Sequence, residues 1–172
     1  GRRPGSRVRS VQAGESIQAE IAEAGANDLI LVAPGTYDEM LIMWKPVQLQ
    51  GWGEGSTTTN AIKAPPEKLE AWRHLLDSLE SEDALVPGQE GAIGGGGLNA
   101  DTFFSEEGAG VLVVAKSTGA SSFSTADNRG ARIDGFTITG ADTGGGVVVS
   151  GYADFLDISN NRIISNSGFY GG

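Results

Sequence analysis

Apolar positions near the N-terminus first follow a helical period and then break into short runs. Over residues 15–25, Ile17, Ile21 and Ala24 recur at helical spacing and so share one face. Ser16 is placed to cap this segment, and Gly25 follows its end. The pattern predicts a short amphipathic helix over residues 16–24.

Residues 28–53 contain three short apolar segments, each ended by a tight break. Residues 29–32 stop at a Pro-Gly pair, residues 40–43 stop at Lys-Pro, and apolar residues alternate with glutamines over residues 47–50 before a glycine. A hairpin protein would show longer strands and two-residue turns of the Asn-Gly type. Three strands within about 25 residues favour the coils of a solenoid instead.

The pattern of short apolar segments and tight turns is interrupted between about residues 54 and 110. After Pro65-Pro66, apolar residues fall on one helical stripe and predict a helix over about residues 66–81. A run of four glycines at 94–97 then indicates a loop. We interpret 54–110 as an insertion in the solenoid. It carries His74, the only histidine, whose position on an amphipathic helix indicates a solvent-facing residue rather than a catalyst.

A 25-residue repeat appears in the last third of the chain. Ile133 matches Ile158, and Ile138 matches Ile163, as expected for coils stacked on one another. The same offset places Arg132 beside Asp157, where we expect a cross-strand ion pair, and places Thr137 beside Arg162. It also places Asn161 in an inward column, so we interpret Asn160 or Asn161 as a turn residue that binds the backbone of a neighbouring coil.

These motifs resemble the opening of right-handed parallel β-helix proteins of the pectate-lyase-like superfamily. The similar features are the helix at 16–24, Pro34-Gly35-Thr36-Tyr37, the segment Lys45-Pro46-Val47-Gln48-Leu49-Gln50-Gly51, and two coils at 133–140 and 156–166. The resemblance implies an all-β right-handed parallel β-helix solenoid with an N-terminal capping helix and a helical/loop insertion. We expect a flexible leader over residues 1–14 and a solenoid over residues 15–172. No segment is predicted to cover its C-terminal end, so we expect a fragment of a longer protein.

Composition excludes several functions. The formal net charge is −10, which disfavours nucleic acid and anionic membrane surfaces as partners. No apolar run approaches the roughly 18 residues of a membrane span. The chain has no cysteine, so it can form neither a disulfide nor a thiolate metal site.

The resemblance also implies a candidate chemistry. Lyases of this superfamily hold Ca²⁺ with acidic side chains and use Arg or Lys as a base; the hydrolases use pairs of carboxylates. The candidate catalytic residues here are therefore Arg132, Asp134, Asp157 and Arg162, and the candidate Ca²⁺ ligands are Asp134, Asp154 and Asp157. None matches a catalytic motif of the family. Four aromatic residues could stack on sugar rings if exposed: Trp44, Trp52, Tyr152 and Tyr170.

Two functions stay open. The chain is part of a secreted, cell-surface or periplasmic β-helix protein that binds or modifies polysaccharide, as a lyase or hydrolase if it is an enzyme. Alternatively, it is a non-catalytic, adhesin-like structural solenoid. A groove with clustered carboxylates and arginine, roofed by the insertion, would favour the first. A flat face of polar ladders would favour the second.

Overall fold

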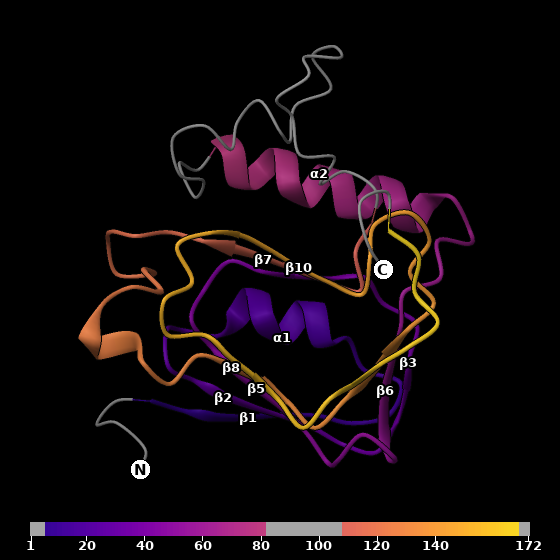
Figure 1. Cartoon of the computed structure of the whole chain (residues 1–172), viewed down its shortest axis with the longest axis horizontal. Coiled ribbons are helices and arrows are strands. Elements are labelled where there is room, and N and C mark those ends of the chain that lie inside the picture. Colours follow the sequence, from indigo (N-terminus) through magenta and orange to yellow (C-terminus); the bar gives the residue numbers. More distant parts are fainter. Residues whose placement is uncertain (1–5, 82–107, 169–172) are drawn as a thin grey trace.

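The computed structural model describes residues 6–81 and 108–168 and consists mainly of three parallel β-sheets. The chain visits the sheets in turn, so each complete coil adds one strand to each sheet. Viewed down the stack, the sheets form three sides of a prism (Figure 1). The predicted fold class is confirmed: the chain is a parallel β-helix with an N-terminal capping helix and a helical insertion.

Each sheet is built from strands of successive coils. Sheet A contains, in spatial order, β1 (Val8–Val11), β2 (Leu29–Val32), β5 (Gln48–Gly51), β8 (Arg132–Asp134) and β11 (Asp157–Ser159). Sheet B contains β3 (Gly35–Tyr37), β6 (Thr57–Asn60), β9 (Thr137–Thr139) and β12 (Arg162–Ile163). Sheet C contains β4 (Leu41–Met43), β7 (Val111–Ala115) and β10 (Val147–Gly151).

The predicted isoleucine columns are present. Ile158 pairs with Ile133 across β11 and β8, and Ile163 pairs with Ile138 across β12 and β9. Ile133 and Ile138 are fully buried, whereas Ile158 and Ile163 are 39% and 42% exposed at the C-terminal end of the stack. Successive coils differ in length. Leu29 pairs with Gln48, 19 residues later, whereas Arg132 pairs with Asp157, 25 residues later. The turns absorb this difference while the strands keep their register.

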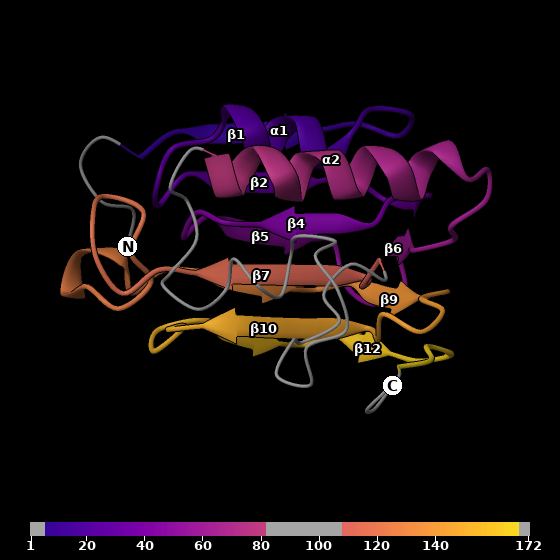
Figure 2. The same cartoon turned by 90° about the horizontal axis from the view of Figure 1, so that it is seen from above.

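Helix α1 (Ile17–Glu23) covers the N-terminal end of the stack (Figure 2). Ser16 caps it, accepting a hydrogen bond from the Ala19 N–H at 3.1 Å, and Ile17 and Ile21 pack into the core inside the sheets. The helix is followed by extended backbone at Ala24, and Gly25, which comes next, does not have a left-handed φ. The Gly25 N–H donates to Asp28 instead.

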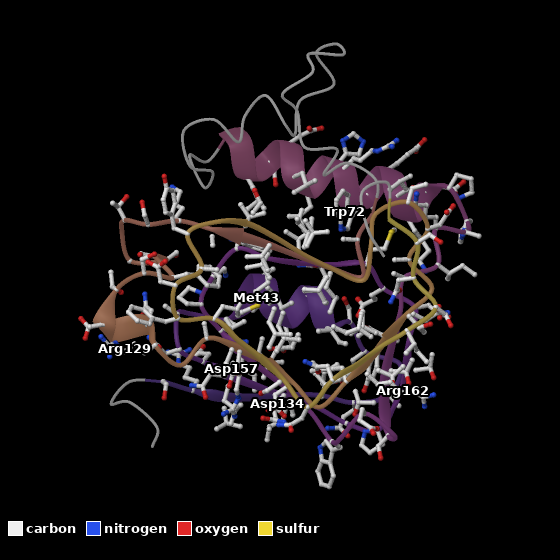
Figure 3. The ribbon with its side chains drawn as sticks, in the orientation of Figure 1. Met43, Trp72, Arg129, Asp134, Asp157 and Arg162 are labelled. Carbon is white, nitrogen blue, oxygen red and sulfur yellow. The ribbon has the colours of Figure 1, made fainter. Side chains whose placement is uncertain are left out.

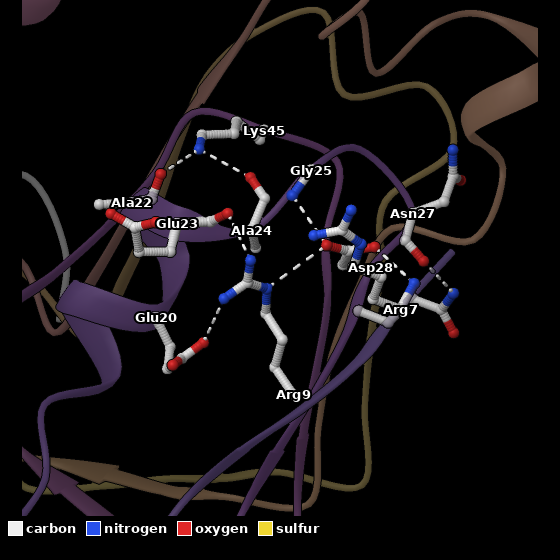
Figure 4. A network of polar contacts seen from close by, with 11 residues as sticks. Arg7, Arg9, Glu20, Ala22, Glu23, Ala24, Gly25, Asn27, Asp28 and Lys45 are labelled. Atoms are coloured by element: carbon white, nitrogen blue, oxygen red, sulfur yellow. Dashed lines mark hydrogen bonds and ion pairs between the residues drawn. The ribbon is translucent and has the colours of Figure 1, made fainter. Parts of the chain in front are cut away.

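The leader expected at residues 1–14 is wrong for residues 8–11, which form β1 and pair with β2. Arg9 fixes this strand to the cap: its guanidinium contacts Glu20 at 3.0 Å and Asp28 at 3.5 Å and donates to the Glu23 carbonyl (Figure 4). The Lys45 ammonium group donates to the Ala22 and Ala24 carbonyls at the other side of the helix end. These contacts give Arg9 and Lys45 a structural role.

The insertion begins later than predicted, because β6 belongs to sheet B. Sequence periodicity missed this strand because its inward residues are polar. Thr57 and Thr59 are both buried, and the Thr57 hydroxyl accepts the Trp52 N–H at 3.0 Å. Of the insertion, the structure describes α2 (Glu67–Ser81), close to the predicted bounds; the glycine run at 94–97 lies outside the described residues.

Helix α2 lies on the outer face of sheet C (Figure 1). Its Trp72, Leu76 and Leu79 form a second apolar cluster with outward residues of that sheet, including Leu112 and Val114. Strand β7 is therefore buried on both faces, which explains its uninterrupted apolar sequence. No helix in the described ranges is both long and apolar enough to span a bilayer.

Candidate functional site

The residues predicted to carry chemistry lie on two different faces of the solenoid. Arg132, Asp134 and Asp157 point outward from sheet A, Arg162 points outward from sheet B, and Asp154 lies between β10 and β11 (Figure 3). Helix α2 covers sheet C, so it does not roof any of them. The predicted set is therefore not gathered beneath the described part of the insertion.

The ion pair expected between Arg132 and Asp157 is not present among the described residues, although the two residues are register partners. The Arg132 Nε atom is instead buried without a hydrogen-bond partner, and Asp157 is exposed. The backbones of Arg132 and Asp157 are therefore adjacent, but their charged groups are not in contact. This expectation is corrected by the structure.

Asp134 lies in a hydrogen-bonded ladder that crosses three coils. Its Oδ1 accepts from Gln50 Nε2 at 2.8 Å, and its Oδ2 accepts from Ser159 Oγ and Asn160 Nδ2, both at 2.9 Å. Burial on its own would raise the pKa of Asp134, but these hydrogen bonds and the charge of Arg132 together lower the pKa below its usual value. The carboxylate is held ionised with both oxygens occupied.

The three candidate metal ligands do not form a metal site. Within residues 6–81 and 108–168, no group of three or more acidic or histidine side chains is arranged to hold an ion. Since Ca²⁺ takes six to eight oxygen ligands, the isolated carboxylates Asp134, Asp154 and Asp157 supply too few in one place. His74 is exposed on α2, as expected, with Asp77 at 3.9 Å.

Two of the four aromatic residues meet the condition for sugar stacking. Trp52 is 68% exposed and Tyr152 is 54% exposed. Trp44 is half-buried against the apolar clusters with Lys45 over its ring, and Tyr170 lies outside the described residues.

Trp52 lies on a loop that is fixed to the Asp134 turn. The Gly53 N–H donates to the carbonyl of Gly135, the residue after Asp134, at 3.1 Å, and Thr137 Oγ1 donates to the Glu54 carbonyl. The Trp52 N–H is itself bonded to Thr57. The loop that carries the exposed indole therefore lies beside the Asp134 turn, at the edge between sheets A and B. We call Gln50, Trp52, Asp134, Ser159 and Asn160 the edge cluster.

A second feature, missed by the sequence analysis, is a groove at the corner between β3 and β4. It consists of two adjoining depressions of about 200 and 270 Å³ that share Asp38 and Glu39. We call it the corner groove. One depression is bounded by α2, the other by the start of α1; the lining residues are Gly14, Glu15, Ser16, Gln18, Thr36, Tyr37, Asp38, Glu39, Met40, Lys68, Ala71, Trp72 and Leu75.

The acidic residues of the corner groove differ in how they are bound. Glu39 caps α1 with both oxygens, accepting from Ser16 Oγ and from the Ile17 N–H at 2.8 Å. Asp38 uses Oδ1 to accept from Asn60, and Glu15 uses Oε2 to accept from the Gln12 N–H. Burial, with the negative charges of Glu15 and Glu39, raises the pKa of Tyr37.

No family model matches the chain, and neither does any curated protein or solved structure. The class of the protein is therefore defined by its own architecture. It is a parallel β-solenoid that carries an exposed aromatic edge cluster and an acidic corner groove.

Proposed function

We propose that this chain is a polysaccharide-binding part of a β-helix protein of the pectate-lyase-like kind, secreted or displayed at the cell surface or in the periplasm. The observation that carries the proposal is Trp52, exposed to 68% on a loop hydrogen-bonded to the next coil. An exposed indole on a backbone held in this way offers an apolar face for the C–H groups of a sugar ring. The superfamily assignment rests on the motifs at residues 15–53, which fold into the first coils.

The polar members of the edge cluster complement this platform. The ladder contains amide, hydroxyl and carboxylate groups, from Gln50, Asn160, Ser159 and Asp134. Groups of these kinds can exchange hydrogen bonds with sugar hydroxyls. The ladder runs along the stack from coil to coil, and its side chains are half-buried to exposed. Such a surface suits an extended chain of sugars better than a single small molecule.

Binding without cleavage is the form of this function that the geometry supports best. A general acid needs a carboxyl group that is protonated near neutral pH, whereas the pKa of Asp134 is lowered and both its oxygens are engaged. Arg132 and Asp157 are not paired, so they form no acid–base couple. We therefore place no catalytic step on the residues that resemblance suggested.

The test is affinity electrophoresis through gels containing soluble polysaccharides of neutral, acidic and amino types. At least one should retard the native chain, and Trp52→Ala should abolish that retardation. Tyr152→Ala is the matched control, because Tyr152 is an exposed aromatic residue that follows β10 of sheet C, away from the edge between sheets A and B. Absence of retardation by every polysaccharide, or full retardation of Trp52→Ala, would remove the proposal.

A non-catalytic structural solenoid is the second candidate, favoured by the outward columns of small polar residues. In sheet B, Thr36, Thr58 and Thr137 are successive register partners, and the ladder at Asp134 binds coil to coil. These features serve stability without a ligand. A chain that binds no polysaccharide and loses stability when the ladder is cut would favour this role.

A further inference from the structure

The side-chain hydrogen bonds of the edge cluster all run toward Asp134. An ionised carboxylate only accepts hydrogen bonds, so each side chain that bonds to it must present a donor. Gln50 Nε2 donates to Oδ1 at 2.8 Å, and Ser159 Oγ and Asn160 Nδ2 donate to Oδ2, both at 2.9 Å. The carboxylate therefore holds both amide groups with their nitrogen atoms toward it and their oxygen atoms away from it.

Those two amide oxygens are left without a partner. Gln50 Oε1 and Asn160 Oδ1 accept no hydrogen bond from the residues that the structure describes. Gln50 Oε1 is not among the buried unpaired atoms, and Asn160 is exposed, so both oxygens are open to solvent. Gln50 Nε2 also contacts the Gly51 and Asp134 carbonyls, at 3.1 and 3.4 Å, which uses its second N–H. The cluster thus offers a ligand mainly acceptors.

The charge beside the Trp52 loop has the same sign. Figure 3 shows Asp134 at the corner where sheets A and B meet. Glu54, two residues after Trp52, is exposed, and its carboxylate has no partner among the described residues, because Thr137 binds its backbone carbonyl. The cation whose charge acts on Asp134 is Arg132, two residues earlier on β8. Two carboxylates and one guanidinium leave this surface negative.

We propose that the edge cluster selects polysaccharides that carry no carboxylate or sulfate groups, with Asp134 as the residue that sets this preference. The inference rests on the proposed function, because it concerns the same surface. Hydroxyl groups of a non-anionic sugar can donate to the free amide oxygens of Gln50 and Asn160. A carboxylate or sulfate group only accepts hydrogen bonds, so it would meet unpaired acceptors and like charge. Unfavourable contacts of this kind are how a surface discriminates against a competing ligand.

The experiment uses two soluble neutral polysaccharides, a mixed-linkage β-glucan and a galactomannan, and the same polymers after oxidation of their primary hydroxyl groups to carboxylates. Polygalacturonate is the third ligand. Isothermal titration calorimetry at pH 7 and low salt measures the affinity for each. The native chain should bind at least one neutral polymer at least about tenfold more tightly than its oxidised form.

Two results separate this inference from the proposed function. Equal or tighter binding of the oxidised form, or binding of polygalacturonate and of neither neutral polymer, would overturn the inference while the proposed function stands. Binding of none of these polymers would overturn the inference, and the proposed function would fall only if the broader gel test also finds no polysaccharide that retards the chain.

Matched variants assign the preference to the edge cluster. Asp134→Asn should reduce the preference for the neutral polymer at least about threefold, by removing the central charge. The control is Glu70→Gln, which removes the same charge from an exposed position on α2, over sheet C, and should leave the preference unchanged. Equal reductions in both variants would show that net charge alone disfavours anionic polymers, and would overturn the assignment.

A second variant covers the case in which Asp134→Asn does not fold, which circular dichroism melting would reveal. Glu54→Gln removes the neighbouring charge without cutting any hydrogen bond of the ladder, since only the backbone carbonyl of Glu54 is bonded. It should also reduce the preference for the neutral polymer relative to Glu70→Gln. A preference as large in Glu54→Gln as in Glu70→Gln would contradict the role of local charge beside Trp52.

Discussion

Asn161 donates a hydrogen bond from Nδ2 to the carbonyl oxygen of Ile133 at 2.7 Å, one coil away in the stack. Its Oδ1 accepts from the Phe136 N–H at 2.9 Å, so one side chain satisfies two backbone groups of the preceding turn. Asn166 repeats this arrangement with the Ile138 carbonyl and the Ala141 N–H. The predicted turn role of asparagine is thereby confirmed for Asn161, while Asn160 binds Asp134 instead.

Asn161→Ala should destabilise the chain, because it leaves the Phe136 N–H and the Ile133 carbonyl without their partner. The expected loss in the free energy of unfolding is about 1–3 kcal/mol. Urea denaturation followed by circular dichroism measures it. The control is Asn160→Gly, which keeps the left-handed backbone at that position (φ 52°) and removes a side chain bonded to a side chain. A loss no larger for Asn161→Ala than for this control would contradict the prediction.

The two isoleucines of one column should differ in their contribution to stability. Ile133 is fully buried between coils, so Ile133→Ala should cost about 2–5 kcal/mol through lost contacts and a residual cavity. Ile158 is its register partner but is 39% exposed, so Ile158→Ala should cost clearly less. Thermal and chemical denaturation of both variants compare them directly. Equal losses would show that the two positions are equally enclosed in solution.

Sequence patterns predicted the fold where the inward residues are aliphatic and repeat. The 25-residue spacing of Ile133 and Ile158 indicated stacked coils. The apolar residues of α2 recur at helical spacing and indicated a helix with one buried face. The same reasoning failed at Thr57 and Thr59, which are polar and yet buried in β6. It also failed at β1, where four residues with a central arginine are too short and too polar to indicate a strand.

The candidate sites were harder to predict because they depend on side-chain geometry between distant segments. Register placed Arg132 beside Asp157 correctly, but a shared register does not fix where long side chains point. The ladder at Asp134 joins Gln50, 84 residues earlier in the sequence, and no local pattern connects the two. The corner groove combines residues of the first coils with Trp72 of the insertion, whose docking position the sequence does not reveal.

Stability should fall in acid, in part through Asp134. Its pKa is lower in the folded chain than the ordinary value of 3.8, so the unfolded chain binds more protons as the pH falls. Its contribution is therefore complete above about pH 5 and is lost as the pH falls through the lower folded pKa. The pKa of Asp28 is shifted in the same direction, because hydrogen bonds from the Arg7 and Gly25 N–H groups and from Arg9 outweigh the effect of burial.

The variant Asp134→Asn isolates the first of these contributions. It should be less stable than the native chain at pH 7, and the difference should shrink towards pH 3 because the Asp134 carboxylate of the unfolded native sequence is protonated before that of the folded chain. Chemical denaturation at several pH values gives the two curves. A difference that stays constant from pH 7 to pH 3 would mean that the ionisation of Asp134 is not linked to folding.

Two glycines of one turn should respond in opposite ways to a methyl group. At Gly51, an added Cβ would lie 2.3 Å from the Gly135 carbonyl oxygen and 3.1 Å from Thr57 Cβ, so the turns of adjacent coils would have to separate. At Gly55 nothing lies within 4 Å, and the backbone does not require a left-handed φ. Gly51→Ala should therefore cost about 1–3 kcal/mol by overpacking, whereas Gly55→Ala should be neutral or stabilising by up to about 1 kcal/mol.

The comparison also tests whether close stacking of turns supports the edge cluster. Separation of the turns at Gly51 would shift the loop that holds Trp52, because the Gly53 N–H is bonded to that same Gly135 carbonyl. Gly51→Ala should therefore change the fluorescence emission of Trp52, measured as the difference from a Trp52→Phe background, while Gly55→Ala leaves it unchanged. If both variants are as stable as the native chain, the coils are not packed backbone to backbone at this turn. In that case the loop carrying Trp52 would also lose the rigid support that makes it a suitable platform.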